Sequence, residues 1–206
     1  MPSLALHQVR VAAAAKFIAD NFAKPIHKQD VILACLFHDI GNILKFDLTI
    51  FPEALQPEGI EYWRAIKDDY RKKYGADQHE ATIKIAREIG LSDEVISCIS
   101  IVAFSKAEEV LQNGSWEQKI CEYADSRVAP GGIASLEDRL RDARKRYLAR
   151  HTDPGAISTQ DGFEILLEAE RQIERQIFEE TSITSEDITD TAIAPIIEEL
   201  WEYPVP

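Results

Sequence analysis

The sequence predicts an all-α protein of 206 residues. Nearly every segment repeats its apolar residues with the 3.6-residue period of an amphipathic helix, and no run alternates apolar and polar residues as a half-buried strand does. Ser, Asp and Gly residues interrupt these periodic segments at positions where helix caps are expected. Together, these observations indicate a bundle of helices joined by loops.

Three helices are expected in the first 75 residues. The first begins at Ser3, a candidate N-cap, and stops before Lys24-Pro25, because the residue before a proline is pushed out of the α region. The second covers Val31 to Leu44, and its apolar residues on most faces indicate a central, buried helix. The third, from Glu61 to Tyr74, is amphipathic, basic and aromatic. Turn residues mark the loop before it: Pro52, Pro57 and Gly59.

The middle of the chain shows three further helices, each with a cap. Asp77 is an N-cap, and Glu80 stands three residues later in the capping-box position. Ser115 with Gln118 repeats this pattern before a later helix. The expected helices run from Asp77 to Ile89, from Asp93 to Phe104 and from Ser115 to Val128.

The remaining helices divide the chain into two predicted units. A helix from Ser135 to Arg150 is followed by Asp153-Pro154-Gly155, the clearest linker candidate. Beyond it lie a long acidic helix, residues 160–180, and a terminal helix, residues 192–203. We therefore expect a helical body over residues 1–150 and an acidic helical extension over residues 151–206 that packs on it.

The charge is strongly negative and unevenly distributed. The chain has 23 Lys and Arg against 36 Asp and Glu, a net charge of −13. Residues 161–206 contain 13 of the acids and only Arg171 and Arg175 as bases, so the first 160 residues are almost neutral. Because a negative potential repels polyphosphate and anionic lipid, we expect neither stable nucleic-acid binding nor membrane binding. A small phosphorylated partner remains compatible with the near-neutral body.

The cysteines and the early apolar run suggest a cytoplasmic protein. Cys35, Cys98 and Cys121 are odd in number and far apart in apolar helical patterns, which indicates reduced core thiols. The longest early apolar run, Val11 to Ala19, is broken by Lys16. This run is too short for a membrane span or the core of a signal peptide.

His38 is followed directly by Asp39 at the end of an apolar helix. An ionised carboxylate removed from water needs a partner or a cation, and a divalent metal ion would supply one. Imidazole nitrogen and carboxylate oxygen suit Mn, Fe, Co, Ni, Zn or, less well, Mg, so the donor types do not select the ion. The alternative is a plain helix C-terminus, with His38 near its negative end and Asp39 exposed before Gly41.

Two further residues extend this pair. His7 lies 31 residues earlier in LALHQV, and Asp125 lies 86 residues after Asp39 in CEYADSRV. The order His…His-Asp…Asp in a helical body resembles the HD-domain superfamily of metal-dependent phosphohydrolases. The resemblance covers roughly residues 4–130, and we find none for residues 131–206. It rests on ILACLFHDIGN, HEATIKIAREIGLSDEVISCI and YADSRV.

The resemblance implies an HD-domain helical bundle in which His7, His38, Asp39 and Asp125 bind one divalent metal ion. Such a set leaves coordination positions open for water and a phosphoryl oxygen, so attack by metal-activated water is the simplest mechanism. Asp39 is then a catalytic candidate as well as a ligand. The alternatives are a surface histidine for His7, and a cap or ion-pair partner of Arg127 for Asp125.

His79 and Glu80 are further catalytic candidates. In two-metal members of the superfamily, a histidine at this helix start and others after the next helix bind a second ion. Here the corresponding stretch, SIVAFSKAEE, has no histidine, so we expect a single ion. His79 would then face the pocket as a phosphate ligand or proton donor, and Glu80 would be an acid or base unless it only completes the helix cap. Some nucleotidases and alarmone hydrolases of the superfamily carry an acidic pair soon after the His-Asp motif. This chain has Gly41-Asn42 there, which counts against those subfamilies.

Basic residues near the motif are candidates for substrate binding. Lys45 and Arg127 are close in sequence to the ligands and are the best single candidates for contact with phosphate. Arg64, Lys67 and Arg71 form a basic stripe on the expected third helix. An aromatic stripe runs beside it and could stack a base, or the aromatics could anchor the helix to the core under a solvated charged face. The aromatic residues are Trp63, Tyr70 and Tyr74.

The sequence thus predicts a phosphohydrolase that acts on a small phosphate ester, for which a nucleotide is a plausible candidate. One alternative is a non-catalytic, metal-stabilised interaction module whose acidic C-terminal helices bind a partner protein. Another is a di-iron oxygenase or lyase on the same fold, although the missing histidines count against a second iron. The C-terminal helices are also the expected surface for a homodimer.

Overall fold

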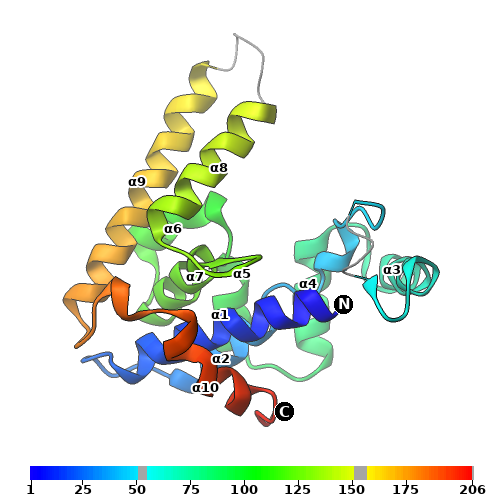
Figure 1. Ribbon diagram of the computed structural model, residues 1–206, viewed down its shortest axis with the longest axis horizontal. Coiled ribbons are helices and arrows are strands. Elements are labelled where there is room, and N and C mark those ends of the chain that lie inside the picture. The colour runs from blue at the N-terminus through cyan, green and yellow to red at the C-terminus, as the bar shows by residue number, and fades with distance from the viewer. Residues whose placement is uncertain (51–54, 151–156, 206) are drawn as a thin grey trace.

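The computed structural model describes residues 1–50, 55–150 and 157–205, and it is a helical bundle with one small hairpin (Figure 1). The all-α prediction is confirmed. No helix in these described ranges is long and apolar enough to cross a membrane. The α-helices are α1 (Pro2–Asp20), α2 (Lys28–Phe37), α3 (Ile60–Tyr74), α4 (Gln78–Glu88), α5 (Asp93–Ile101), α6 (Ala107–Asn113), α7 (Trp116–Arg127), α8 (Leu136–Arg150), α9 (Ile157–Glu179) and α10 (Asp190–Leu200).

Helices α1, α2 and α7 form the centre of the core. Helix α1 packs against α2, α7 and α10, and residues Val11 to Ala15 are fully buried along it. Four of those five residues are alanines, whose small side chains let neighbouring backbones approach closely. In α2, residues Val31 to Cys35 are likewise buried in succession. Two helices, and not only α2 as predicted, are therefore enclosed by others.

Helix α2 ends seven residues earlier than the sequence predicts. Its last residue is Phe37, and a turn then leads to a 3-10 segment, Asn42–Leu44. The imidazole Nδ1 of His38 lies 2.8 Å from the carbonyl oxygen of Cys35 and donates a hydrogen bond to it. This bond satisfies one of the carbonyls that a helix leaves free in its last turn. His38 and Asp39 consequently lie in the turn and not within a helix.

Two short elements were not expected. Helix α6 covers only seven residues, and the strands β1 (Val128–Ala129) and β2 (Gly132–Ile133) pair antiparallel around a tight turn. Elements of this length show too few repeats for periodicity to reveal them. Helix α5 also ends at Ile101, before the predicted Phe104.

The acidic extension shares its core with the body. Leu167, Ile173 and Ile177 of α9 and Ile193 and Leu200 of α10 are buried in the same cluster as α1, α2 and α7. The apolar face of α9 therefore packs within its own chain, whereas α8 and the first part of α9 project as an antiparallel pair (Figure 1). The predicted linker, Asp153-Pro154-Gly155, lies outside the described residues.

A turn after the His-Asp pair touches α4 at close range. The backbone N–H of Gly41 donates to Thr82 Oγ1 at 3.0 Å, and that hydroxyl donates to the carbonyl of Gln78 at 2.9 Å. A Cβ atom at Gly41 would meet this carbonyl oxygen and lie 2.7 Å from Thr82 Oγ1. Glycine is therefore required here because two backbones meet, and the contact fixes the turn that carries Asp39.

We expect Gly41→Ala to lower the free energy of unfolding by about 1–3 kcal/mol, because α4 must move away from the turn. Chemical denaturation measures the change. Gly162→Ala is the control, since nothing lies within 4 Å of a Cβ on this glycine of α9. It should raise the free energy of unfolding by about 0.5–1 kcal/mol. Equal effects of the two substitutions would contradict the close approach at Gly41.

Two fully buried carboxyl groups join α7 to α9. Glu122 is 1 % exposed and accepts a hydrogen bond from the backbone N–H of Ala103, while Glu170 is 0 % exposed and accepts one from Ser126. Burial raises the pKa of Glu170 to about 7 and raises the pKa of Glu122 as well, and the neighbouring Glu170 raises the pKa of Glu122 further. Protonation of one carboxyl group removes the repulsion between two buried charges, which explains how Glu122 and Glu170 can both lie in the core.

This pair predicts a loss of stability toward neutral pH. Below pH 4.5 Glu170 is protonated in both folded and unfolded chains, so it has no effect. Between pH 4.5 and about 7 only the unfolded chain releases the proton, which lowers the free energy of unfolding by about 1–3 kcal/mol. Urea unfolding at pH 5 and pH 7.5 should show a smaller decrease for Glu170→Gln. Glu198→Gln, at an exposed position, should behave like the parent chain, and an unchanged pH dependence in Glu170→Gln would refute the assignment.

Candidate metal centre

Two histidines and two aspartates from distant parts of the chain converge at one end of the core. His7 lies on α1, His38 and Asp39 follow α2, and Asp125 lies near the end of α7. The Oδ1 atom of Asp125 is 3.1 Å from His7 Nε2 and 3.4 Å from His38 Nε2. The Oδ2 atom of Asp39 is 3.8 Å and 3.7 Å from the same two nitrogens. One nitrogen or oxygen from each of His7, His38 and Asp39 lies within 4.8 Å of the others, a spacing that could hold a metal ion.

The orientation of the His38 ring is fixed by a hydrogen bond from its Nδ1 atom. Because Nδ1 donates to the carbonyl of Cys35, a neutral ring carries its proton there and leaves the lone pair of Nε2 free. The side chain is 1 % exposed, and Nε2 is a buried polar atom without a hydrogen-bond partner. A buried nitrogen that makes no hydrogen bond and faces two carboxylates is what a metal ligand would present. The four side chains therefore fit a bound metal ion.

The electrostatics of the cluster favour a cation between the four side chains. Burial disfavours a charge on His38, but Asp39 and Asp125 outweigh it and raise the pKa of this imidazole to about 9. Burial also works against the charge of Asp125, yet the imidazoles of His38 and His7, whose Nε2 atoms lie 3.4 Å and 3.1 Å from its Oδ1, hold the pKa of that carboxyl well below its usual range. The carboxylate of Asp125 therefore retains its negative charge, and either a proton on His38 or a metal ion can balance it.

The cluster has a closed side and an open side. His38 is almost completely buried, whereas the side chains of His7 and Asp39 are each 25 % exposed and that of Asp125 is 32 % exposed. An ion held here would be enclosed on the side of α2 and accessible from solvent on the other. Donors of two nitrogens and two carboxylates suit several first-row divalent metals.

The comparison with protein families agrees with this geometry. The family model of the HD domain matches residues 4–141, which is more than half of the chain. The chain belongs to the HD-domain family. It is therefore placed in the superfamily of metal-dependent phosphohydrolases that the His-Asp motif suggested. No curated protein and no solved structure matches the chain.

The other predicted catalytic residues of this HD-domain protein, His79 and Glu80, lie on the first turn of α4. His79 is half-buried, and its backbone N–H donates to Asp77, the N-cap. Glu80 is exposed and its carboxylate lies 3.5 Å from Lys84, so it pairs along the helix surface and does not complete a capping box. Gln78 of the same turn contacts Gly41, so the start of α4 lies against the turn that follows Asp39.

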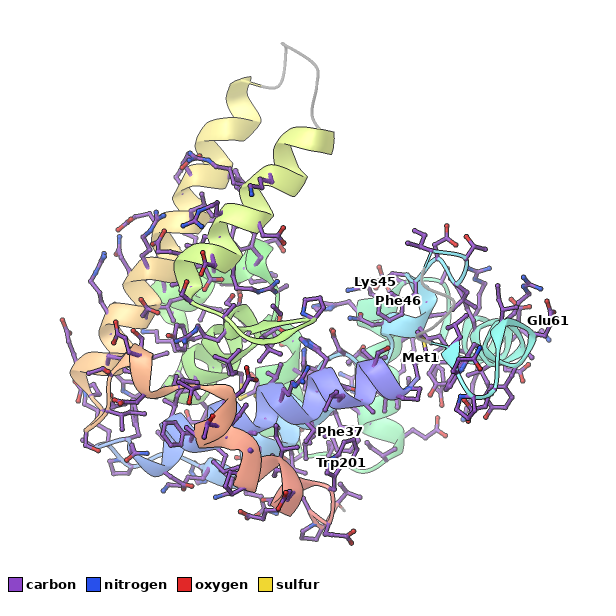
Figure 2. All side chains as sticks on the ribbon, viewed as in Figure 1. Met1, Phe37, Lys45, Phe46, Glu61 and Trp201 are labelled. Carbon is purple, nitrogen blue, oxygen red and sulfur yellow. The ribbon has the colours of Figure 1, made fainter. Side chains whose placement is uncertain are left out.

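The residues of the basic stripe on α3 have other contacts or are exposed. Arg64 pairs with Glu61 on the exposed surface, and Figure 2 shows Glu61 on the outer side of α3. Lys67 donates from Nζ to the backbone carbonyl of Phe46 at 2.5 Å, which ties α3 to the preceding loop. Arg71 is exposed. Lys45, also exposed, stands at the end of the 3-10 segment that follows the His-Asp turn.

Arg127 has a structural role in place of the expected contact with phosphate. It is 4 % exposed, and its guanidinium donates to the carbonyls of Ala134 and Ser185 at 2.6 Å and 3.1 Å and to the hydroxyl of Tyr123. The N–H groups of Arg127 that would bind a phosphate are therefore already bonded to these acceptors within the protein. Asp125 is likewise not an ion-pair partner of Arg127, since its described partners are the two histidines.

Sequence reasoning missed three contributors to the centre. The carbonyl of Cys35 orients His38, Thr82 holds the turn after Asp39, and Gln8 follows His7 as a buried amide. A backbone carbonyl leaves no trace in the residue type. Gln8 is different, because a polar residue directly after the candidate ligand His7 is visible in the sequence.

We expect His38→Gln to abolish stoichiometric binding of Mn²⁺, because the only buried nitrogen donor of the cluster is lost. Metal analysis after loading and gel filtration measures the retained ion. His27→Gln is the matched control, since His27 precedes α2 at its opposite end and should leave the metal content unchanged. Retention of a full equivalent of metal by His38→Gln would place the ion elsewhere.

Proposed function

We propose that the protein is a metal-dependent phosphohydrolase that cleaves a small phosphate ester, with a nucleotide as the favoured substrate. The observation that carries the proposal is the buried Nε2 of His38, which makes no hydrogen bond in the described protein and faces the carboxylates of Asp39 and Asp125 at 3.7 Å and 3.4 Å. A structural histidine would use both ring nitrogens within the fold. Membership of the HD-domain family supports the same class of chemistry.

His7, His38, Asp39 and Asp125 would hold one divalent ion. When bound, such an ion supplies Lewis-acid polarisation of a phosphoryl oxygen and lowers the pKa of a water molecule. His38 orients the ion from the buried side, with its ring fixed by Cys35. Asp39 and His7, on the exposed side, border the positions at which substrate and water would arrive. The chain's own contribution is thus a fixed set of donors with one open face.

Residues beside the open face would position the ester and move protons. Asp39 can orient a water molecule through its exposed oxygen and accept a proton from it. His79, half-buried on the turn of α4 that lies against the Gly41 turn, is our candidate for donating a proton to the leaving oxygen. Lys45 remains the candidate for contact with phosphate, because its ammonium is exposed and has no described ion pair. Glu80 is a weaker acid or base candidate, since Lys84 already pairs with it.

The cellular setting follows from the sequence. We infer a cytoplasmic enzyme, because Cys35, Cys98 and Cys121 are all free and buried among the described residues. The net charge of −13 opposes long polyanions as partners and leaves small phosphate esters as substrates. A homodimer through the C-terminal helices would use the surfaces of α9 and α10 that the core leaves exposed, such as Ile165 and Trp201.

The protein loaded with Mn²⁺ should release phosphate from at least one member of a panel of phosphate monoesters and nucleotides. Asp39→Asn should lower kcat by about 100-fold or more, and its metal content should fall with it. Asp47→Asn is the matched control, because Asp47 lies in an exposed loop and its side chain bonds only with Thr49 among the described residues. Its activity should equal that of the parent chain.

His79→Gln should lower kcat by about 10–100-fold and leave the metal content unchanged, because a proton donor is lost while the ligands remain. The two measurements together separate the role of His79 from that of Asp39. A panel with no turnover under any metal, together with an unaltered metal content in Asp39→Asn, would refute the proposed function. A non-catalytic module stabilised by metal would then account for the site.

A further inference from the structure

A cleft of about 140 Å³ lies between the start of α1 and α3. Leu4 and Gln8 of α1 form one wall, Ile40 lies in the His-Asp turn, and α3 supplies the opposite wall with Trp63, Ile66 and Tyr70. Figure 2 shows Met1, another lining residue, at the end of α1 nearest α3. A cavity of about 150 Å³ is sufficient for one benzene ring. The size of the cleft therefore suits a single aromatic ring system.

The wall on α3 is a fixed aromatic surface. Trp63, Ile66 and Tyr70 recur at helical spacing and pack on a small cluster of Ile43, Leu44 and Ala81, separate from the main core. The indole N–H of Trp63 donates to the carbonyl of Leu55 at 3.1 Å, which fixes the ring. Rigid aromatic rings present their faces for stacking at little entropic cost.

The cleft has no charged side chain among its lining residues, and one polar group stands out. Gln8 is 8 % exposed, and its Nε2 is buried without a hydrogen-bond partner. A buried amide left unpaired costs free energy, so the native fold retains it against a penalty. A ligand that brings a hydrogen-bond acceptor into the cleft would remove this penalty.

The cleft is joined to the metal centre through the backbone. Gln8 follows His7 on α1, and Ile40 follows Asp39 in the turn. Sequence neighbours of two metal ligands thus line the cleft, and we infer that the organic part of an ester bound at His7 and Asp39 reaches it. Phosphate itself has no cationic side chain to pair with there, because the lining side chains are apolar or neutral.

We propose that this cleft binds the heteroaromatic ring of the substrate, as a nucleobase, through stacking on Trp63 and a hydrogen bond from Gln8. The inference deepens the proposed function and rests on it for the position of the phosphate. It assigns Gln8 and Trp63 to substrate specificity and leaves the metal ligands to the reaction.

The first test measures ring binding without any reaction. Adenosine, guanosine, cytidine and uridine are each titrated into the full-length protein in the presence of a chelator, with ribose as the ring-free control, by calorimetry. We expect at least one nucleoside to bind and ribose not to bind. Gln8→Leu and Trp63→Leu should each weaken the binding about tenfold. Trp201→Leu, at a side chain that is 54 % exposed, should not change it.

Stability separates recognition from a structural role. Because Gln8 Nε2 has no partner, Gln8→Leu should keep or raise the Tm while it weakens nucleoside binding. Trp63→Phe keeps an aromatic ring and should retain more binding than Trp63→Leu, which guards against a loss of folding in the leucine variant. Absence of binding by all four nucleosides, or equal binding by the parent chain and Gln8→Leu, overturns the proposal.

The second test compares nucleoside 5′-monophosphates with ribose 5-phosphate in the metal-loaded protein. We expect kcat/KM to be at least about tenfold higher for the best nucleotide, and Gln8→Leu to reduce that preference without affecting ribose 5-phosphate. Equal hydrolysis of both kinds of ester overturns the cleft proposal while the proposed function stands. Nucleoside binding without hydrolysis of any ester supports the cleft and refutes the proposed function.

Discussion

The structure depends on keeping two carboxylates and two imidazoles together at the edge of an apolar core. Asp39 and Asp125 are held within 4 Å of the same ring nitrogens by three separate helical segments. Such a group is tolerated only when a positive charge lies among the acids. The buried stretches of α1, α2 and α7 supply the rigid frame, and their packing and the charge balance therefore support each other.

The next layer holds this centre in register. The carbonyl of Cys35 sets the ring of His38, and Thr82 on α4 sets the turn that begins at Asp39. Helix α3 packs on a second, smaller apolar cluster that includes Ile43 and Leu44, which follow the His-Asp turn. Our proposals thus assign chemistry and specificity to different parts of the chain, since α1, the turn after α2 and α7 carry the ligands and α3 lines the cleft.

The fold class and the four clustered residues could be predicted from the sequence, because helical periodicity and the motif His…His-Asp…Asp are local or ordered patterns. The end of α2 and the role of Arg127 could not. His38 turns the chain by capturing a carbonyl three residues earlier, which competes with a strongly helical pattern. Arg127 is saturated by carbonyls 7 and 58 residues away, and no feature of its neighbours in the sequence indicates those partners.

The hydrogen bonds of Arg127 also indicate that the acidic extension is needed to complete the fold around the HD domain. This arginine is two residues from Asp125, and the carbonyl of Ser185 that satisfies it belongs to the acidic extension. A chain cut at Arg141, where the family match stops, would leave a buried guanidinium without that acceptor and would uncover the apolar faces against which α9 and α10 pack. The match to the family model is therefore shorter than the packed unit, because the acidic extension completes the apolar core and the hydrogen bonds of a residue close to the ligand Asp125.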